Sequence, residues 1–233
     1  MTLLTGRDRI SKAKNGVTVR LLLLADLHNR VEGLDAVAGG HDAVLLAGDI
    51  ANFGGLEKVR EILSVLEEHC PVVLGVSGNC DPSGVAELLK DRGALLDGIV
   101  VEHQNFCFAG ISGTEPSVFN QDREYPNSPF LKTLQKIKSA LKPSLPFVFV
   151  SHQPAFNTSV DKFAQGQHTG SRAIRTFIME TEPILAVSGH IHEAVSKDKI
   201  GRTILVNPGP FKNGLYATAE INGTCVDIQF QSL

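Results

Sequence analysis

Short apolar runs that end directly in polar residues constrain this chain more than any other feature. In the first half these runs are Val17–Leu24, Ala43–Leu46 and Val72–Val76, and each is largely continuous rather than alternating. Continuous runs of this length are typical of strands that are buried on both faces. Helical patterns lie between them, the longest over Leu56–Glu68, where apolar residues recur on one face. This alternation predicts an α/β layered fold.

The second half repeats the strand signal and closes with a predicted hairpin, because Asn222-Gly223 between the last two runs is a strong turn signal. The predicted strands are Phe106–Ala109, Phe147–Val150, Ile184–Val187, Thr203–Val206, Leu215–Glu220 and Cys225–Phe230. Further helices are expected around Leu34 and Val37, over Gly84–Lys90 with Ser83 as N-cap, over Leu131–Leu141, and over Arg172–Met179 with Thr169 or Ser171 as cap. A long loop is expected over Ser112–Phe130.

Composition limits the classes of function. The 233 residues carry a formal charge of −3, which provides no basic footprint for nucleic acid. The length favours one domain over 1–233, with 1–16 as a lead-in, and a homodimer fits a compact chain of this size. The run Val17–Leu24 is too short to cross a membrane, so a cytoplasmic protein is expected. Three cysteines beside or within strands are expected to be reduced core thiols: Cys70, Cys107 and Cys225.

Polar residues that bind metal ions stand at the ends of five of these runs. Ligands at the carboxyl ends of buried strands converge on one edge of an open α/β sheet. Adjoining glycines let the backbone turn sharply at these points. In chain order the residues are Asp26 and His28, Asp49, Asn79, His152, and His190 with His192.

Two carboxylates, one amide oxygen and four imidazoles form a coherent ligand set for two divalent ions. Imidazole suits zinc, iron, cobalt, nickel and manganese, and the oxygen ligands favour manganese among them. Two ions held about 3.5–4 Å apart activate a shared water and stabilise charge on a phosphate. The ligand set therefore predicts hydrolysis of a phosphate ester, in which a hydroxide that bridges the ions attacks phosphorus in line.

The ordered motifs resemble those of the calcineurin-like metallophosphoesterases. The series is Asp26-Leu27-His28, Gly48-Asp49, Gly78-Asn79, His152, and Gly189-His190-Ile191-His192. The likeness extends from the first strand to Gly209. The chain is most similar to the compact prokaryotic Icc-related phosphoesterases, through the segments Ser151–Pro154, Gln167–Arg175 and Asn207–Pro210.

The resemblance implies a four-layer sandwich of two mixed sheets flanked by helices. It also implies that Asp49 bridges two ions and that Asp49 and Asn79 take part in catalysis. Of the remaining ligands, Asp26, His28 and His192 would hold one ion, whereas Asn79, His152 and His190 would hold the other.

The sequence departs from that family after Asn79, where Cys80 replaces the usual His. In relatives this His contacts the scissile phosphate and helps to protonate the leaving oxygen, and a thiol is a weaker donor. The change favours a phosphodiesterase over a phosphomonoesterase, and it leaves Asp81 with a turn or helix-cap role. His168 is a candidate replacement acid, and an exposed loop position is the alternative interpretation.

Two further residues are candidates for contact with a small phosphorylated substrate, beside Asn79, Cys80 and His168. Asn29 could donate a hydrogen bond to phosphate or form a turn, and Arg172 could bind phosphate or lie on a helix surface. A rival function is a scaffold of the same fold that binds a protein partner and has lost activity. A nuclease is disfavoured, because the charge does not suit contact with a phosphate backbone.

Overall fold

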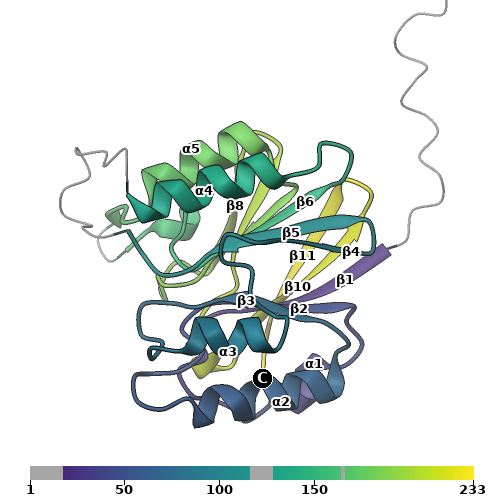
Figure 1. The fold of residues 1–233 in the computed structure, drawn as a ribbon, viewed down its shortest axis with the longest axis vertical. Helices are drawn as coiled ribbons and strands as arrows, with labels where there is room; N and C mark the ends of the chain where they lie inside the picture. The colour runs from purple at the N-terminus through teal and green to yellow at the C-terminus, as the bar shows by residue number, and fades with distance from the viewer. Residues whose placement is uncertain (1–17, 116–127, 164–165) are drawn as a thin grey trace, which may run out of the picture.

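The computed structural model describes residues 18–115, 128–163 and 166–233, and these residues form two mixed β-sheets between two layers of helices (Figure 1). The first sheet has the strand order β11-β10-β1-β2-β3. β1 runs parallel to β2 and antiparallel to β10, so the sheet is mixed. Its strands are β1 (Thr18–Leu24), β2 (Ala43–Ala47), β3 (Val73–Val76), β10 (Leu215–Asn222) and β11 (Cys225–Ser232).

The second sheet has the order β4-β5-β6-β7-β9-β8. Its four central strands are parallel, and an antiparallel strand lies at each edge. The strands are β4 (Val100–His103), β5 (Phe106–Ile111), β6 (Phe147–Ser151), β7 (Leu185–Val187), β8 (Ser196–Ile200) and β9 (Thr203–Asn207).

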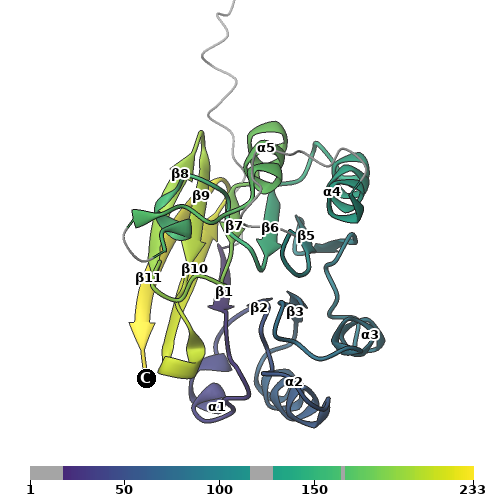
Figure 2. The ribbon, with the colours of Figure 1, turned by 90° about the vertical axis from the view of Figure 1, so that its left-hand side faces the viewer.

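Three apolar clusters hold the four layers together, and Figure 2 shows the layers from the side. One cluster fills the space between the sheets and includes Leu21 and Leu23 of β1 and Val148 and Val150 of β6. A second lies under α1 (Leu34–Ala38), α2 (Glu57–His69) and α3 (Val85–Asp91), and a third under α4 (Pro129–Ala140) and α5 (Arg172–Thr181). Because β1 is covered on both faces, its sequence is continuously apolar from Leu21 to Leu24.

The predicted fold class is confirmed, and so are the predicted strands, within one or two residues at their ends. The final hairpin forms at Asn222, which pairs with Cys225. Ser171 is the N-cap of α5, since its hydroxyl oxygen accepts a hydrogen bond from the Ile174 N–H at 3.0 Å. Two short 3₁₀ helices, Ser159–Asp161 and Phe211–Asn213, lie in loops.

Three expectations need correction, and two strands add to the predicted set. The N-cap of α3 is Gly84 in a left-handed conformation, and not Ser83. The loop after Ser112 ends before Pro129, where α4 begins; its residues 116–127 lie outside the described ranges. Cys225 is exposed rather than a core thiol. The edge strands β4 and β8 were not predicted.

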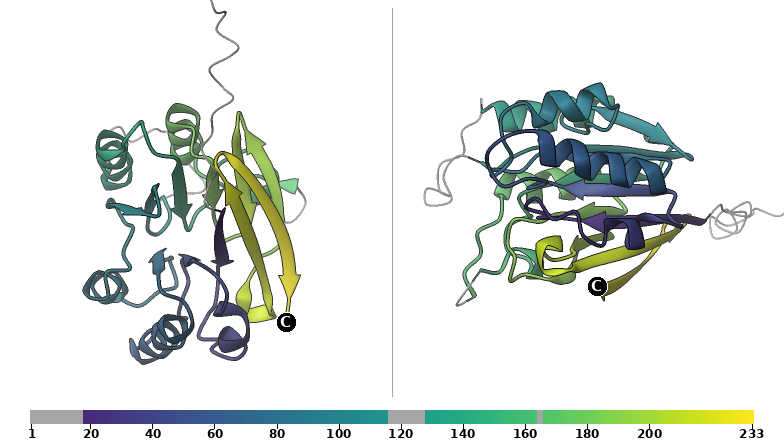
Figure 3. Two further views of the ribbon diagram at one scale, coloured as in Figure 1. Left: turned by 90° about the vertical axis from the view of Figure 1, so that its right-hand side faces the viewer. Right: turned by 90° about the horizontal axis from the view of Figure 1, so that it is seen from below.

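None of the helices in the described ranges is long and apolar enough to cross a membrane. Figure 3 shows from two further directions that the helices lie on the outer faces of the two sheets. The expected lead-in, 1–16, lies outside the described residues.

Candidate metal centre

The residues after the buried strands meet in one place, as their positions at strand ends predict. Asp26 follows β1, Asp49 follows β2, His152 follows β6 and His190 follows β7 by a few residues. Backbone hydrogen bonds tie the loops to each other: the Asp26 N–H donates to the Gly48 carbonyl at 3.1 Å, and the Gly189 N–H donates to the His152 carbonyl at 3.0 Å. The site is therefore built from both sheets.

The backbone at this site is in the left-handed region at several residues that are not glycine. The φ angles are +52° at Asp26, +45° at His28, +48° at Asp49 and +69° at His190. Most side chains reach this region at a cost of about 1–2 kcal/mol each, and Asn, Asp and His are found in it more often than other residues. Strained residues of this kind cluster at functional sites, where they aim side chains in fixed directions.

Three glycines leave the space that the ligand side chains occupy. A Cβ atom at Gly48 would meet the ring of His152, and one at Gly78 would meet the Asp49 carboxylate. One at Gly189 would meet the Asp26 carboxylate. Each motif glycine therefore makes room for a candidate ligand of another motif, in addition to any role in turning the chain.

The first group of donor atoms comes from Asp26, His28 and His192. Nε2 of His28 lies 3.3 Å from Nε2 of His192, which lies 3.4 Å from Oδ1 of Asp26. Both oxygens of the Asp26 carboxylate also accept the His190 N–H, at 3.2 Å to Oδ1 and 3.1 Å to Oδ2. That bond fixes the carboxylate in position while Oδ1 faces the imidazole.

The second group comes from Asn79, His152 and His190. The His152 Nδ1–H donates to the carbonyl of Ala47 at 2.8 Å, so Nε2 is the nitrogen that faces the site. This Nε2 lies 3.0 Å from Oδ1 of Asn79. The ring of His190 packs against that of His152 with centroids 5.0 Å apart.

Asp49 lies between the two groups. Its Oδ2 is 3.8 Å from Nε2 of His28, and its Oδ1 is 3.5 Å from Nε2 of His152. Oδ1 also accepts the Cys80 N–H at 2.8 Å. One carboxylate thus presents an oxygen to each side of the site.

The donor set fits divalent metal ions. Donors that are each about 2.0–2.2 Å from one ion lie roughly 3.0–3.5 Å apart in tetrahedral or octahedral geometry. The separations His28–His192, His192–Asp26 and His152–Asn79 fall in this range. The sets Asp26-His28-His192 and Asp26-Asp49-His152 each have donor atoms within 4.8 Å of one another. All seven predicted ligands lie at this one site. His190 is placed there by the contact of its ring with that of His152.

Charge and burial prepare the imidazoles for binding. Burial, with a smaller effect from the charge of His152, lowers the pKa of His190 to about 4. Burial also lowers the pKa of His28. Burial alone would raise the pKa of Asp49, but the hydrogen bond and charge of His152 outweigh it and hold this pKa far below its usual range. The Asp49 carboxylate is therefore ionised, and the imidazoles of His28 and His190 are neutral at pH 7. Burial opposes protonation of His152 as well, but the hydrogen bond and charge of Asp49 outweigh it and raise the pKa of His152.

Cys80 lies inside the donor cluster. Its sulfur groups with donor atoms of His28 and Asp49 within 4.8 Å, and it accepts a hydrogen bond from Nδ2 of Asn79 at 3.3 Å. Burial and the adjacent Asp49 carboxylate raise the pKa of the thiol to about 12. In the metal-free protein the group is a neutral thiol and a weak donor.

Asp81 has a role that sequence reasoning missed. Its two oxygens accept the N–H groups of Ala51 and Gly78, each at 2.7 Å, and so clamp the loop after β2 to the loop after β3. Burial raises its pKa despite these two bonds. Of the two expected roles, the helix cap is wrong, because α3 begins at Val85 without a side-chain cap, whereas the bond to the Gly78 N–H, three residues earlier, is a contact within the turn. The bond to Ala51 joins residues 30 positions apart, so it could not be predicted from the sequence around Asp81.

His168 lies on the loop between β6 and α5. Its Nδ1 is 2.7 Å from Oδ1 of Asp161, a fully buried carboxylate that also binds the N–H groups of Asn157 and Gly170. Nδ1 therefore carries the proton, and Nε2 is the free nitrogen. Gln153, next to His152, holds the same loop by donating to the Thr169 carbonyl at 3.3 Å.

The other two substrate candidates have structural contacts. Oδ1 of Asn29 accepts the Asn52 N–H at 3.2 Å, and φ at Asn29 is +73°, as a turn role requires. Arg172 is exposed on α5, with its guanidinium 4.0 Å above the ring of Phe156.

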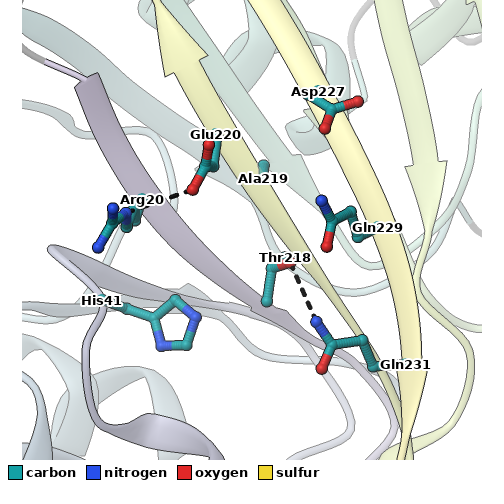
Figure 4. A pocket seen from close by; sticks show the side chains of 8 residues that line it. All are labelled: Arg20, His41, Thr218, Ala219, Glu220, Asp227, Gln229 and Gln231. Carbon is teal, nitrogen blue, oxygen red and sulfur yellow. Dashed lines mark hydrogen bonds and ion pairs between the residues drawn. The ribbon is translucent and has the colours of Figure 1, made fainter.

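A separate polar hollow lies on the outer face of β1, β10 and β11 (Figure 4). Arg20 pairs with Glu220 there at 3.3 Å, and Gln231 donates to Thr218 at 3.5 Å. None of its lining residues belongs to the candidate metal centre.

Comparison with known proteins agrees with this geometry. The family model of the calcineurin-like phosphoesterase superfamily domain matches residues 19–229. An uncharacterized protein of Methanocaldococcus jannaschii is 32% identical over 207 residues, which cover 87% of this chain and 93% of that protein.

Solved structures share the fold at low sequence identity. The TT1561 protein of Thermus thermophilus is 16% identical and has a TM-score of 0.66, with 91% of this chain and 99% of that chain covered. The NAD nucleotidase of Haemophilus influenzae is 13% identical and has a TM-score of 0.57, with 94% of this chain and 51% of that chain covered.

Proposed function

Because the chain belongs to the calcineurin-like phosphoesterase superfamily, we propose that it is a metal-dependent phosphodiesterase with a two-ion centre. The observation that carries the proposal is the position of Asp49, whose two oxygens face separate groups of imidazole donors. A single carboxylate whose two oxygens face separate donor groups suits a pair of ions.

In this proposal Asp26, His28 and His192 hold one ion, and Asn79, His152 and His190 hold the other. Manganese is the expected metal, given the mixed oxygen and imidazole ligands, and zinc, iron, cobalt and nickel are the alternatives. When bound, the ions would lower the pKa of a water and offset the negative charge of a phosphate.

The chain's own residues keep these donors ready. The Ala47 carbonyl holds His152 in the tautomer that leaves Nε2 free, and Cys80 receives one hydrogen from the Asn79 amide, so that Oδ1 of Asn79 faces His152. Positioned ligands of this kind need little rearrangement when they bind an ion.

The preference for diesters rests on Cys80 and His168. A neutral thiol at Cys80 donates poorly to a leaving oxygen, so substrates whose leaving groups depart without strong acid help are favoured. His168 is the proposed proton donor: in its doubly protonated form Nδ1–H stays bonded to Asp161, and the proton on Nε2 is the one that is given to the leaving oxygen. Arg172 and Asn29 are also proposed to contact the small phosphorylated substrate.

The test is turnover of an aryl phosphodiester with added Mn²⁺ or Co²⁺, together with a calorimetric metal titration. We expect hydrolysis and two bound ions per chain, and we expect His192→Asn to lose both hydrolysis and the first ion. His69→Asn is the matched control, since His69 is an exposed residue of α2. Tight binding of metal without turnover for any divalent ion would instead indicate the scaffold function.

A further inference from the structure

Phe53 is the most exposed large hydrophobic residue in the described part of the chain, with 68% of its surface accessible. It lies in the loop that follows Asp49 and precedes α2. Burial therefore gives little reason for an aromatic side chain at this position.

The backbone makes an aromatic residue there unfavourable. φ at Phe53 is +41°, and the next residue, Gly54, has φ +99°. Asn or Gly adopts the left-handed region easily, whereas a bulky side chain is strained in it. Folding alone would favour a smaller residue at position 53, so the ring is present against the local conformational preference.

The loop holds Phe53 beside the candidate metal centre. The Phe53 N–H donates to the carbonyl of Cys80 at 2.9 Å, and the sulfur of Cys80 lies within the donor cluster of His28 and Asp49. On its other side, the Asn52 N–H donates to Oδ1 of Asn29. The loop is thus fixed both to the segment after β1 and to the segment after β3.

We propose that Phe53 is a stacking platform for a planar aromatic group on the phosphoester substrate. The proposal rests on the proposed hydrolase function and adds the substrate class. An exposed ring offers a face to another ring, and strain at a fixed loop position is typical of a preorganised binding residue. A nucleobase and a simple aryl ring share the required chemistry, and stacking by itself does not select between bases.

A single tryptophan provides the test, because the chain contains none. In full-length Phe53→Trp protein supplied with divalent metal, adenosine monophosphate and phenyl phosphate are titrated separately while Trp fluorescence is recorded. We expect both to quench the emission, and glycerol 3-phosphate, which lacks a ring, to leave it unchanged. Stronger quenching by the nucleotide assigns a nucleobase, and equal quenching assigns a general aryl site.

Met179→Trp is the matched control, because Met179 is also exposed but lies on the outer helix α5. Its emission should not respond to either ligand. The stacking inference is overturned if Phe53→Trp also fails to respond, or if glycerol 3-phosphate quenches it equally. Turnover of an aryl phosphodiester by Phe53→Trp is measured in parallel, and turnover without quenching refutes the stacking inference alone, whereas the absence of both refutes the proposed hydrolase.

A second variant distinguishes a binding role from a structural one. Phe53→Asn should relieve backbone strain and raise the melting temperature, while it raises KM for aromatic phosphodiesters about 10-fold or more and changes kcat little. A residue needed for packing would give the opposite result, a lower melting temperature with an unchanged KM.

Discussion

Oδ1 of Asp49 lies 3.5 Å from Nε2 of His152, and the second oxygen of the same carboxylate is turned toward the other half of the site. Replacing Asp49 by Asn keeps the size of the side chain and suits the left-handed backbone, but removes the charge. We expect both ions to bind more weakly and turnover to fall by about 10³-fold or more. Calorimetry and turnover measure the two effects, and near-normal activity would refute the bridging role.

Cys80→His restores an imidazole at the position where the family usually has one. The thiol, with a pKa of about 12, holds its proton tightly at neutral pH. We expect the variant to hydrolyse phosphomonoesters about 10-fold or more faster, and to gain less on p-nitrophenyl esters, whose leaving group needs little acid help. If monoester turnover does not change, residue 80 is remote from the leaving oxygen.

Asp81→Asn weakens the clamp between two loops. Asn can accept from only one of the two N–H groups, those of Ala51 and Gly78, that the carboxylate binds. Leaving a buried donor without a partner costs about 1–3 kcal/mol. We therefore expect a lower free energy of unfolding, measured by urea denaturation, and weaker binding of the ion held by Asn79.

Asp97→Asn is the comparison for this variant, because Asp97 accepts the N–H of Ser112 in another loop. It should lose some stability and leave metal affinity intact. The two variants would behave alike if Asp81 only supported the fold.

The metal-free protein should lose stability as the pH falls from about 6.5 to about 4, in part because of His190. The pKa of this residue is lowered to about 4 by burial, so the unfolded chain takes up the proton first. His190 therefore contributes a loss of folding stability. The loss begins as the pH falls below the pKa of His190 in the unfolded chain and is complete below its pKa in the folded protein. By linkage it amounts to something on the order of 3 kcal/mol.

The measurement compares wild type with His190→Asn in chelator, by denaturation at several pH values. The stability difference should shift in favour of the variant as the pH falls across this window. His152, whose pKa is raised mainly through Asp49 despite its burial, acts in the opposite sense but is present in both proteins. A pH-independent difference would contradict the assignment.

The central strands could be predicted from the sequence, because a strand that is covered on both faces consists of a continuous run of apolar residues. β4 and β8 lack this signal: they are edge strands, and β8 reads Ser-Lys-Asp-Lys-Ile with alternating burial. The turn into β5 uses Gln104-Asn105, both at positive φ, which is an uncommon pair for such a hairpin.

The candidate ligands could be predicted for a related reason, since each follows a recognisable strand. The bond of Asp81 to Ala51 could not, because it depends on which loops meet after the sheets have formed, and the Asp161–His168 pair could not, because it depends on how the long connection between β6 and α5 folds back on itself. Short polar contacts between loops leave no periodic trace in a sequence.

The left-handed backbone at the candidate ligands determines which substitutions are informative at this site. Alanine at Asp26, His28, Asp49 or His190 would add conformational stress to the loss of a donor atom, and the two effects would be counted as one. Asparagine tolerates the same backbone torsions, so it changes the donor atom without adding conformational stress. Scanning with asparagine therefore reports the chemistry of each side chain, whereas scanning with alanine would exaggerate it.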